Sequence, residues 1–195
     1  MEFYLFHYSD YQKLYNCSIY EVEDIPLEDR QHIILGSTFL ILFVAFELLY
    51  IPCLFAIWKH LRNPCYKLMF FMGLIDVVIM IIPGFLTGIY SILGVMYCSN
   101  PLFQYFTGCA GTFLWALESS TSIVLAINRC LEIYSPQLGK RMFEEKRVYM
   151  WMLITAVYSF FYSSLSHPIT FNGIYVSWFF NPHLGVIDDS VERKA

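Results

Sequence analysis

Three acidic side chains, Glu47, Asp76 and Glu118, lie inside stretches that are otherwise almost entirely apolar. An acid at bilayer depth is costly, so such a residue is a candidate functional site. Each of the three stands between 9 and 12 residues from a basic residue at the end of its stretch. That separation is about 14–18 Å along a helix, close to half of a bilayer core that is about 30 Å thick. The spacing predicts one layer of acids near the middle of a membrane.

Two readings of this layer remain open. Like charges so close cannot all ionise, so either one carboxyl group is protonated at neutral pH or the group shares a cation. The layer is then a coupled polar or ion-binding site formed by Glu47, Asp76 and Glu118. In the other reading each acid is neutral and only hydrogen-bonds a backbone or hydroxyl group of the next helix.

The composition indicates that lipid surrounds the elements carrying these acids. Of 195 residues, 57% are hydrophobic and only 14% are charged, against about 25% charged in an ordinary soluble domain. A water-soluble four-helix bundle is the alternative, but its helices would each show a polar face, which these stretches lack. A net charge of -4 gives no indication of the basic surface that nucleic-acid-binding proteins need. We therefore expect a membrane protein, with membrane lipid as a partner.

A membrane-spanning helix needs about 20 apolar residues, and four stretches meet or approach this length. They predict an all-α transmembrane helical bundle whose region 33–165 contains four spans. A Pro83-Gly84 pair predicts a kink in the second span. The expected spans are 33–58, 68–96, 102–131 and 148–165, preceded by an extracellular tail, 1–32, and followed by an extracellular loop or tail, 166–195.

The basic residues predict the orientation, because they accumulate on the cytoplasmic side. The connections after the first and third spans are basic, whereas the N-terminal tail is mainly acidic and the connection after the second span carries no charge. We expect a multi-pass protein of the plasma membrane with its N-terminus outside. Asn16, in the pattern Asn16-Cys17-Ser18, is a candidate N-glycosylation site in that outer tail. The basic connections contain Lys59, Arg62, Lys67, Arg129, Lys140, Arg141, Lys146 and Arg147.

A short motif ends the third span. The simplest interpretation of the motif is an arginine that extends its charge to the membrane surface at a helix end, followed by a proline that stops the helix. Its spacing resembles the Asp-Arg-Tyr-x-x-Ile-x-x-Pro segment of rhodopsin-like G-protein-coupled receptors, whose arginine opens or closes the cavity for the G protein. The resemblance implies a switch facing the G protein, although asparagine and cysteine here replace the acid and the tyrosine. The residues are Asn128, Arg129, Cys130, Ile133 and Pro136.

The same receptors carry a Thr-Pro pair before a buried aspartate, and Asn63-Pro64 followed by Asp76 resembles that segment. Asp76 falls on the family's ion-binding aspartate, and Glu118 falls on a neighbouring polar position of the same site. Glu47 lies within about one residue of the conserved asparagine of the first span. The resemblance therefore implies a sodium site at the predicted layer of acids.

A closer resemblance, from about Tyr15 to Asp189, is to nematode serpentine receptors of class T. It implies a seven-span chemosensory receptor with an unknown small-molecule or peptide ligand and a heterotrimeric G protein as partner. The chain would then be a truncated receptor that lacks spans five to seven. The segments that carry the resemblance are Tyr15-Asn16-Cys17-Ser18, Leu49-Tyr50-Ile51-Pro52, Cys65-Tyr66-Lys67-Leu68-Met69, Gly94-Val95-Met96-Tyr97-Cys98 and Leu125-Ala126-Ile127-Asn128-Arg129-Cys130.

Cys17 and Cys98 are the cysteines predicted to lie outside, where disulfides form. A bridge that ties the tail over the bundle is one hypothesis, and two unpaired thiols are the alternative. The five histidines show no metal-ligand spacing and no nucleophile stands with a base, so we expect no metal, no cofactor and no catalytic residue.

The sequence leads first to a partial chemosensory receptor that couples to a G protein, and not to an enzyme. A stand-alone four-span accessory or scaffold protein, which pairs with full-length receptors without signalling itself, is the alternative. The midplane acids alone suggest a third reading, a transporter or channel.

Overall fold

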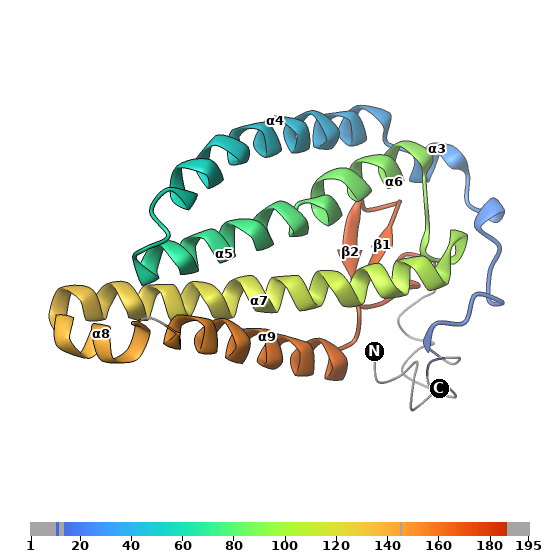
Figure 1. Cartoon of the computed structure of the whole chain (residues 1–195). Coiled ribbons are helices and arrows are strands. Elements are labelled where there is room, and N and C mark those ends of the chain that lie inside the picture. Colours follow the sequence, from blue (N-terminus) through green and yellow to red (C-terminus); the bar gives the residue numbers. More distant parts are fainter. Residues whose placement is uncertain (1–10, 12–13, 145, 187–195) are drawn as a thin grey trace. The chain divides into compact units, whose positions relative to one another are not determined.

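The structure is a computed structural model that describes residue 11, residues 14–144 and residues 146–186 (Figure 1). Parts of the predicted outer segments, residues 1–10 and 187–195, lie outside these ranges. By its internal contacts the chain divides into two compact units. One contains Met1–Phe43, Ile81–Thr112 and Ser163–Ala195, and the other contains Val44–Met80 and Phe113–Tyr162.

Among the described residues, four helical segments are long and apolar enough to cross a membrane: Leu27–Trp58, Pro64–Leu93, Pro101–Tyr134 and Arg147–Leu165. This confirms the predicted all-α transmembrane class. The first segment contains α3 (Leu27–Arg30) and α4 (Ile33–Trp58), the second contains α5 (Pro64–Ile79) and α6 (Thr87–Leu93), and the others are α7 (Pro101–Tyr134) and α9 (Arg147–Leu165). Other helical elements in the described residues are the 3-10 turns Val22–Asp24 and Tyr97–Ser99, a π-helical turn, Ile81–Leu86, and α8 (Pro136–Phe143).

Local chemistry sets the limits of the second span. The Asn63 side chain accepts a 2.9 Å hydrogen bond from the backbone N–H of Cys65 and caps α5, and Pro64 occupies the first helical position, where its missing N–H costs nothing. Pro83-Gly84 falls within the π-helical turn Ile81–Leu86, at the position of the predicted kink. The span ends at Gly94, whose φ of +64° is the left-handed conformation that closes many helices.

In the first unit, the beginning of α4 approaches α6 at backbone distance. A Cβ added to Gly36 would stand 2.6 Å from the carbonyl oxygen of Gly88, so small residues are required at this crossing. Strands β1 (Thr170–Asn172) and β2 (Ser177–Phe179) form an antiparallel hairpin in the same unit. The hairpin packs on α6, because Trp178 donates a 2.8 Å hydrogen bond to Thr87.

In the second unit, α8 folds back beside the end of α7 (Figure 1). Its last residue, Phe143, is 1% exposed and packs in a core that also contains Leu68, Val124 and Val148. Hydroxyl groups join α7 to α9, with 3.5 Å between the Thr121 and Thr155 oxygens and 3.5 Å between those of Ser120 and Ser159.

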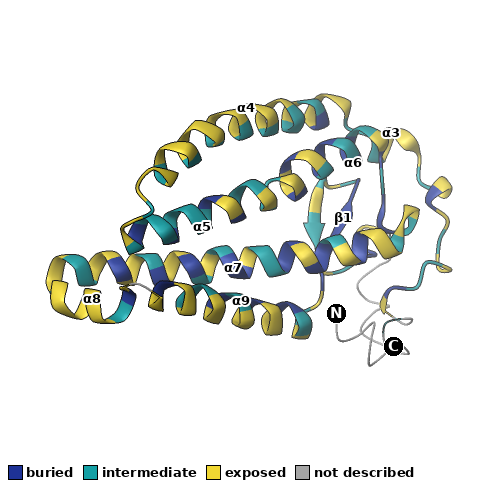
Figure 2. Ribbon diagram, in the orientation of Figure 1, coloured by how far each residue is buried: buried dark blue, intermediate teal, exposed yellow. Residues whose placement is uncertain are grey.

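Large apolar side chains remain exposed along the long helices (Figure 2). On α4, only Gly36 is buried. In water such a surface would aggregate, whereas in a bilayer it meets lipid chains of the same polarity. The exposed helix faces therefore fit the membrane environment expected from the composition.

Candidate functional site

Asp76 on α5 has a hydrogen-bond donor on α4. The Tyr50 hydroxyl donates a 2.7 Å hydrogen bond to Oδ2 of Asp76, and both side chains are half-buried. A hydroxyl group bound to a carboxylate leaves the second oxygen and the remaining lone pairs free for another donor or for a cation. This pair is therefore the centre of the polar layer within the second unit.

The structure brings two of the three predicted acids together. Glu118 on α7 lies within electrostatic range of Asp76, and its charge also reaches Tyr50. Glu47 on α4 is half-buried and has no hydrogen bond or ion pair to any residue that the structure describes. The spacing predicted that Glu47 is the α4 residue next to Asp76. In the structure that residue is Tyr50, which lies almost one helical turn after Glu47 on α4.

Arg129 stands near the end of α7 with a half-exposed side chain. Its guanidinium lies 3.4 Å from the Glu132 carboxylate and 3.4 Å from the sulfur of Met69. It also lies 6.0 Å from the ring centroid of Tyr66, at the outer limit of a cation–π contact. Because these contacts are long and solvent-accessible, they hold the arginine weakly.

The other residues of the predicted switch divide into buried and exposed positions. Asn128 is 1% exposed. Cys130 is an exposed free thiol, and Ile133 is 86% exposed. The helix α7 ends at Tyr134, two residues before Pro136, and Pro136 is the first residue of α8. The motif therefore presents Arg129, Cys130 and Ile133 at the surface and turns Asn128 inward.

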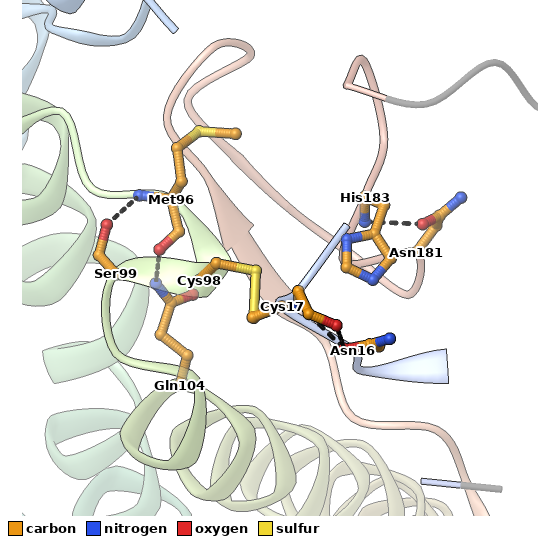
Figure 3. Close-up of a disulfide and its surroundings, with 9 residues drawn as sticks. Asn16, Cys17, Met96, Cys98, Ser99, Gln104, Asn181 and His183 are labelled. Carbon is orange, nitrogen blue, oxygen red and sulfur yellow. Dashed lines mark hydrogen bonds between the residues drawn. A yellow bond between two sulfur atoms is a disulfide. The ribbon is translucent and has the colours of Figure 1, made fainter. Parts of the chain in front are cut away.

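In the part of the first unit predicted to lie outside, a disulfide joins Cys17 of the N-terminal tail to Cys98, which follows α6 (Figure 3). The two Cα atoms are 5.4 Å apart, and 81 residues separate the cysteines in sequence. Closing so large a loop removes many conformations from the unfolded chain. The bond therefore fixes the tail beside the connection between the second and third spans.

A cluster of tyrosines surrounds this disulfide. Tyr15, Tyr97 and Tyr105 pack together with Cys109, and Tyr11 stacks on Tyr15 with 5.3 Å between ring centroids. Burial raises the pKa of the Tyr15 phenol and, more strongly, that of Tyr97, and the neighbouring phenols raise both further. These side chains are neutral at physiological pH and provide an apolar base for the tail.

Gln104 on α7 connects three segments of the same region. Its amide nitrogen donates a 2.8 Å hydrogen bond to the carbonyl of Met96, and its amide oxygen accepts a 3.0 Å bond from the backbone N–H of Phe171 on β1. The side chain is fully buried, and Figure 3 shows it reaching Met96 next to the disulfide. Sequence reasoning missed Gln104; an uncharged polar residue inside an apolar stretch was the available signal.

Asn16, the candidate glycosylation site, precedes the disulfide directly. Its side-chain oxygen accepts hydrogen bonds from the backbone N–H and the hydroxyl of Ser18, at 2.9 and 2.6 Å. The asparagine and the hydroxyl residue of the pattern thus form a closed turn. Both side chains are at least partly accessible.

A family model described as serpentine type 7TM GPCR chemoreceptor Srt matches residues 1–191. The chain belongs to the Srt chemoreceptor family. A curated Srt relative, serpentine receptor class T-55 of Caenorhabditis elegans, is 23% identical over 124 residues. The match covers 62% of this chain and 33% of the relative, so the chain matches about a third of that receptor's length. No solved structure matches it.

Family membership makes this Srt chain a G-protein-coupled-receptor-like protein of the membrane. The resemblance inferred from short motifs is thereby confirmed at the level of the family.

Proposed function

We propose that the chain contributes the first four spans of a chemosensory receptor that binds an external chemical ligand and couples to a heterotrimeric G protein. The observation that carries the proposal is the setting of Arg129. Its side chain is 46% exposed and its one carboxylate contact, to Glu132, is 3.4 Å long. A weakly held guanidinium can exchange its partners for backbone carbonyls of a docking protein at little cost.

In this proposal Asn128 changes the resting state. An asparagine cannot form an ion pair with Arg129, so among the described residues Glu132 on the following turn is the one acidic partner of the guanidinium. The restraint is an exposed i,i+3 pair, which contributes about 0.3–0.5 kcal/mol. We expect the arginine to be available to the G protein in the absence of ligand, and basal coupling to be correspondingly high.

The proposed orientation places the N-terminus outside and Arg129 in the cytoplasm. It is supported by the basic connections and by the closed Asn16–Ser18 turn in the tail. Expression in cells, followed by glycosidase digestion, tests it. Wild-type protein should lose mass on digestion and the Asn16→Gln variant should not. If digestion leaves the wild-type band unchanged, Asn16 carries no glycan and glycosylation gives no support to this orientation.

The coupling test uses the whole chain in lipid nanodiscs and purified GDP-bound heterotrimer. We expect measurable association, weakened about tenfold by Arg129→Ala, since a buried arginine contact is often a dominant one in an interface. Arg62→Ala is the matched control, because Arg62 is an exposed arginine in the other basic connection. If both variants lose the same affinity, the effect of Arg129 is one of net charge and not of a specific contact. If the chain associates with no class of heterotrimer, the proposal is overturned.

A further inference from the structure

An apolar groove lies between α4 and α5 of the second unit, near the end of α4. Its volume is about 270 Å³. The α4 positions that line it recur at the spacing of one helix face, so their side chains form a single stripe along α4. No part of the proposed coupling through Arg129 uses this groove. The lining residues are Ile51, Leu54, Phe55 and Trp58 of α4 and Phe70 of α5.

The two helices meet at Leu54, and the larger side chains beside it remain uncovered. A Cβ added to Gly73 of α5 would stand 2.7 Å from Cδ2 of Leu54, so the glycine permits this close approach. Phe55 and Trp58 nevertheless stay 53% and 58% exposed. The groove is therefore walled by two helices and open to the bilayer that surrounds them.

A positive charge stands at the end of the stripe. Lys59 follows Trp58 directly, and its Nζ lies 4.7 Å from the ring centroid of Phe55, which lines the groove. The lysine forms no ion pair with any residue that the structure describes, and no acidic residue occurs between Glu47 and Asp76. An ammonium has three N–H donors, so a contact with one ring leaves donors for an anion.

Trp58 indicates the depth of this end of the groove in a membrane. Tryptophan rings concentrate at the level of the lipid headgroups, because the ring is apolar and its N–H is polar. The ring nitrogen of Trp58 donates to no residue that the structure describes. The groove thus presents carbon side chains first, and then an indole N–H and an ammonium. A phospholipid presents its acyl chain, its ester groups and its phosphate in the same order.

The charge of Lys59 distinguishes between headgroups. Phosphatidylcholine carries its own ammonium, which the lysine repels, whereas an anionic headgroup has a net negative charge that attracts the lysine. We propose that the groove binds an anionic phospholipid, with one acyl chain along the stripe and the phosphate at Lys59. Lipid meets every exposed face of the helices, so the proposal is a preference for one headgroup class at one place. It needs neither an external ligand nor a G protein, and its failure would leave the proposed function standing.

The test uses the whole chain, labelled with fluorotryptophan, in phosphatidylcholine nanodiscs. Phosphatidylserine or phosphatidylcholine with the same spin-labelled acyl chain is added at equal mole fraction, and the broadening of each fluorine resonance reports the proximity of that lipid. At Trp58 we expect broadening about fivefold stronger with the serine lipid, as for one basic residue at an anionic surface. Trp115, a 56% exposed ring of α7, is the internal control and should respond equally to both lipids. Equal broadening at Trp58 would overturn the proposal.

Charge variants locate the preference. Lys59→Gln should make the two lipids equivalent at Trp58. Lys140→Gln removes the same charge from an exposed position of α8 and should leave the preference for the serine lipid intact. Equal losses in the two variants would assign the preference to net charge and contradict a site at Lys59.

A variant of the lining tests the groove itself. Ile51→Phe adds volume to the lining and should weaken the broadening of Trp58 by the serine lipid several-fold, whereas Ile41→Phe, at an exposed position of α4 in the first unit, should not. Equal effects would show that the lysine attracts lipid without the groove. If neither lipid broadens Trp58 while both broaden Trp115, a second copy or another protein covers the groove and the lipid assignment is wrong.

Discussion

The hydroxyl of Tyr50 donates a 2.7 Å hydrogen bond to Oδ2 of Asp76 and so ties α4 to α5 through an acid that the sequence placed at the middle of the membrane. Glu118 lies within electrostatic range of the same carboxylate. In the structure a phenol and two carboxyl groups therefore lie together, and Glu47 stands almost one helical turn before Tyr50 on α4.

Replacing Tyr50 by Phe removes the donor and leaves the ring. We expect the free energy of unfolding to fall by about 0.6 kcal/mol, the mean for hydrogen bonds between membrane helices, and by no more than about 1.7 kcal/mol. Thermal unfolding in detergent measures the change. Tyr158→Phe, at an exposed tyrosine of α9, is the control. A Tyr50→Phe variant as stable as the control would show that the bond contributes nothing.

Replacing Asp76 by Asn removes one of the two interacting charges. If the layer binds sodium, the wild-type chain should be stabilised by sodium relative to choline, and Asp76→Asn should lose that difference. Glu47→Gln should retain most of it, because Glu47 has no partner among the described residues. Thermal unfolding in the two salts distinguishes the variants. Indifference of the wild type to sodium would instead favour neutral acids that serve only helix packing.

Cys17→Ser opens the disulfide. The chain-entropy model assigns about 2–4 kcal/mol to such a bond, and we expect a loss of that order in the stability of the N-terminal region. Cys98 should then react with a membrane-impermeant maleimide, which it does not do in the oxidised wild type. Cys53→Ser, at an exposed free cysteine of α4, provides the comparison. Reaction of Cys98 in untreated wild-type protein would contradict the bond.

Gln104→Leu leaves the carbonyl of Met96 and the N–H of Phe171 without their buried partner. Each unpaired group costs about 1–3 kcal/mol, so this variant should lose more stability than Tyr50→Phe. Gln137→Leu, at an exposed position of α8, is the matched control. Hydrogen exchange at Phe171 reports the local effect, and protection equal to wild type would argue against the proposed link.

The tyrosine cluster predicts sensitivity to alkali. Because burial raises the pKa values of Tyr15 and Tyr97 above the ordinary 10.0, the neutral phenols stabilise the folded tail fully below pH 10.0. That contribution falls as the pH rises above this value. Unfolding temperatures measured against pH should drop there, and less steeply in Tyr15→Phe. A parallel decline in both proteins would exclude Tyr15 as the cause.

The spans could be predicted from sequence because hydropathy and length are local properties, and α4 in the structure runs from Ile33 to Trp58 as the pattern indicates. The same counting predicts a common depth for Asp76 and Glu118 in a membrane, which stays a prediction. The partner of Asp76 could not be predicted, because helix rotation decides which neighbouring side chain reaches an acid.

Three other features depended on contacts distant in sequence or on the local context. Gln104 meets Phe171 across 67 residues, and the β1–β2 hairpin is stabilised by its packing on α6, so no local pattern revealed either. The motif at the end of the third span predicts a stop before Pro136, and α7 does end at Tyr134; the new helix that follows was not predicted. Proline is equally suited to the first position of a new helix, and α8 begins there.

The bond between Cys17 and Cys98 closes a covalent ring that contains the whole of the first two membrane segments. Such a ring can close only when both cysteines have reached the same face of the bilayer, that is, after the intervening chain has crossed it an even number of times. Oxidation of this pair therefore reports that the first helical hairpin has been inserted, and a protease cut in the connection around His60 would leave both fragments joined.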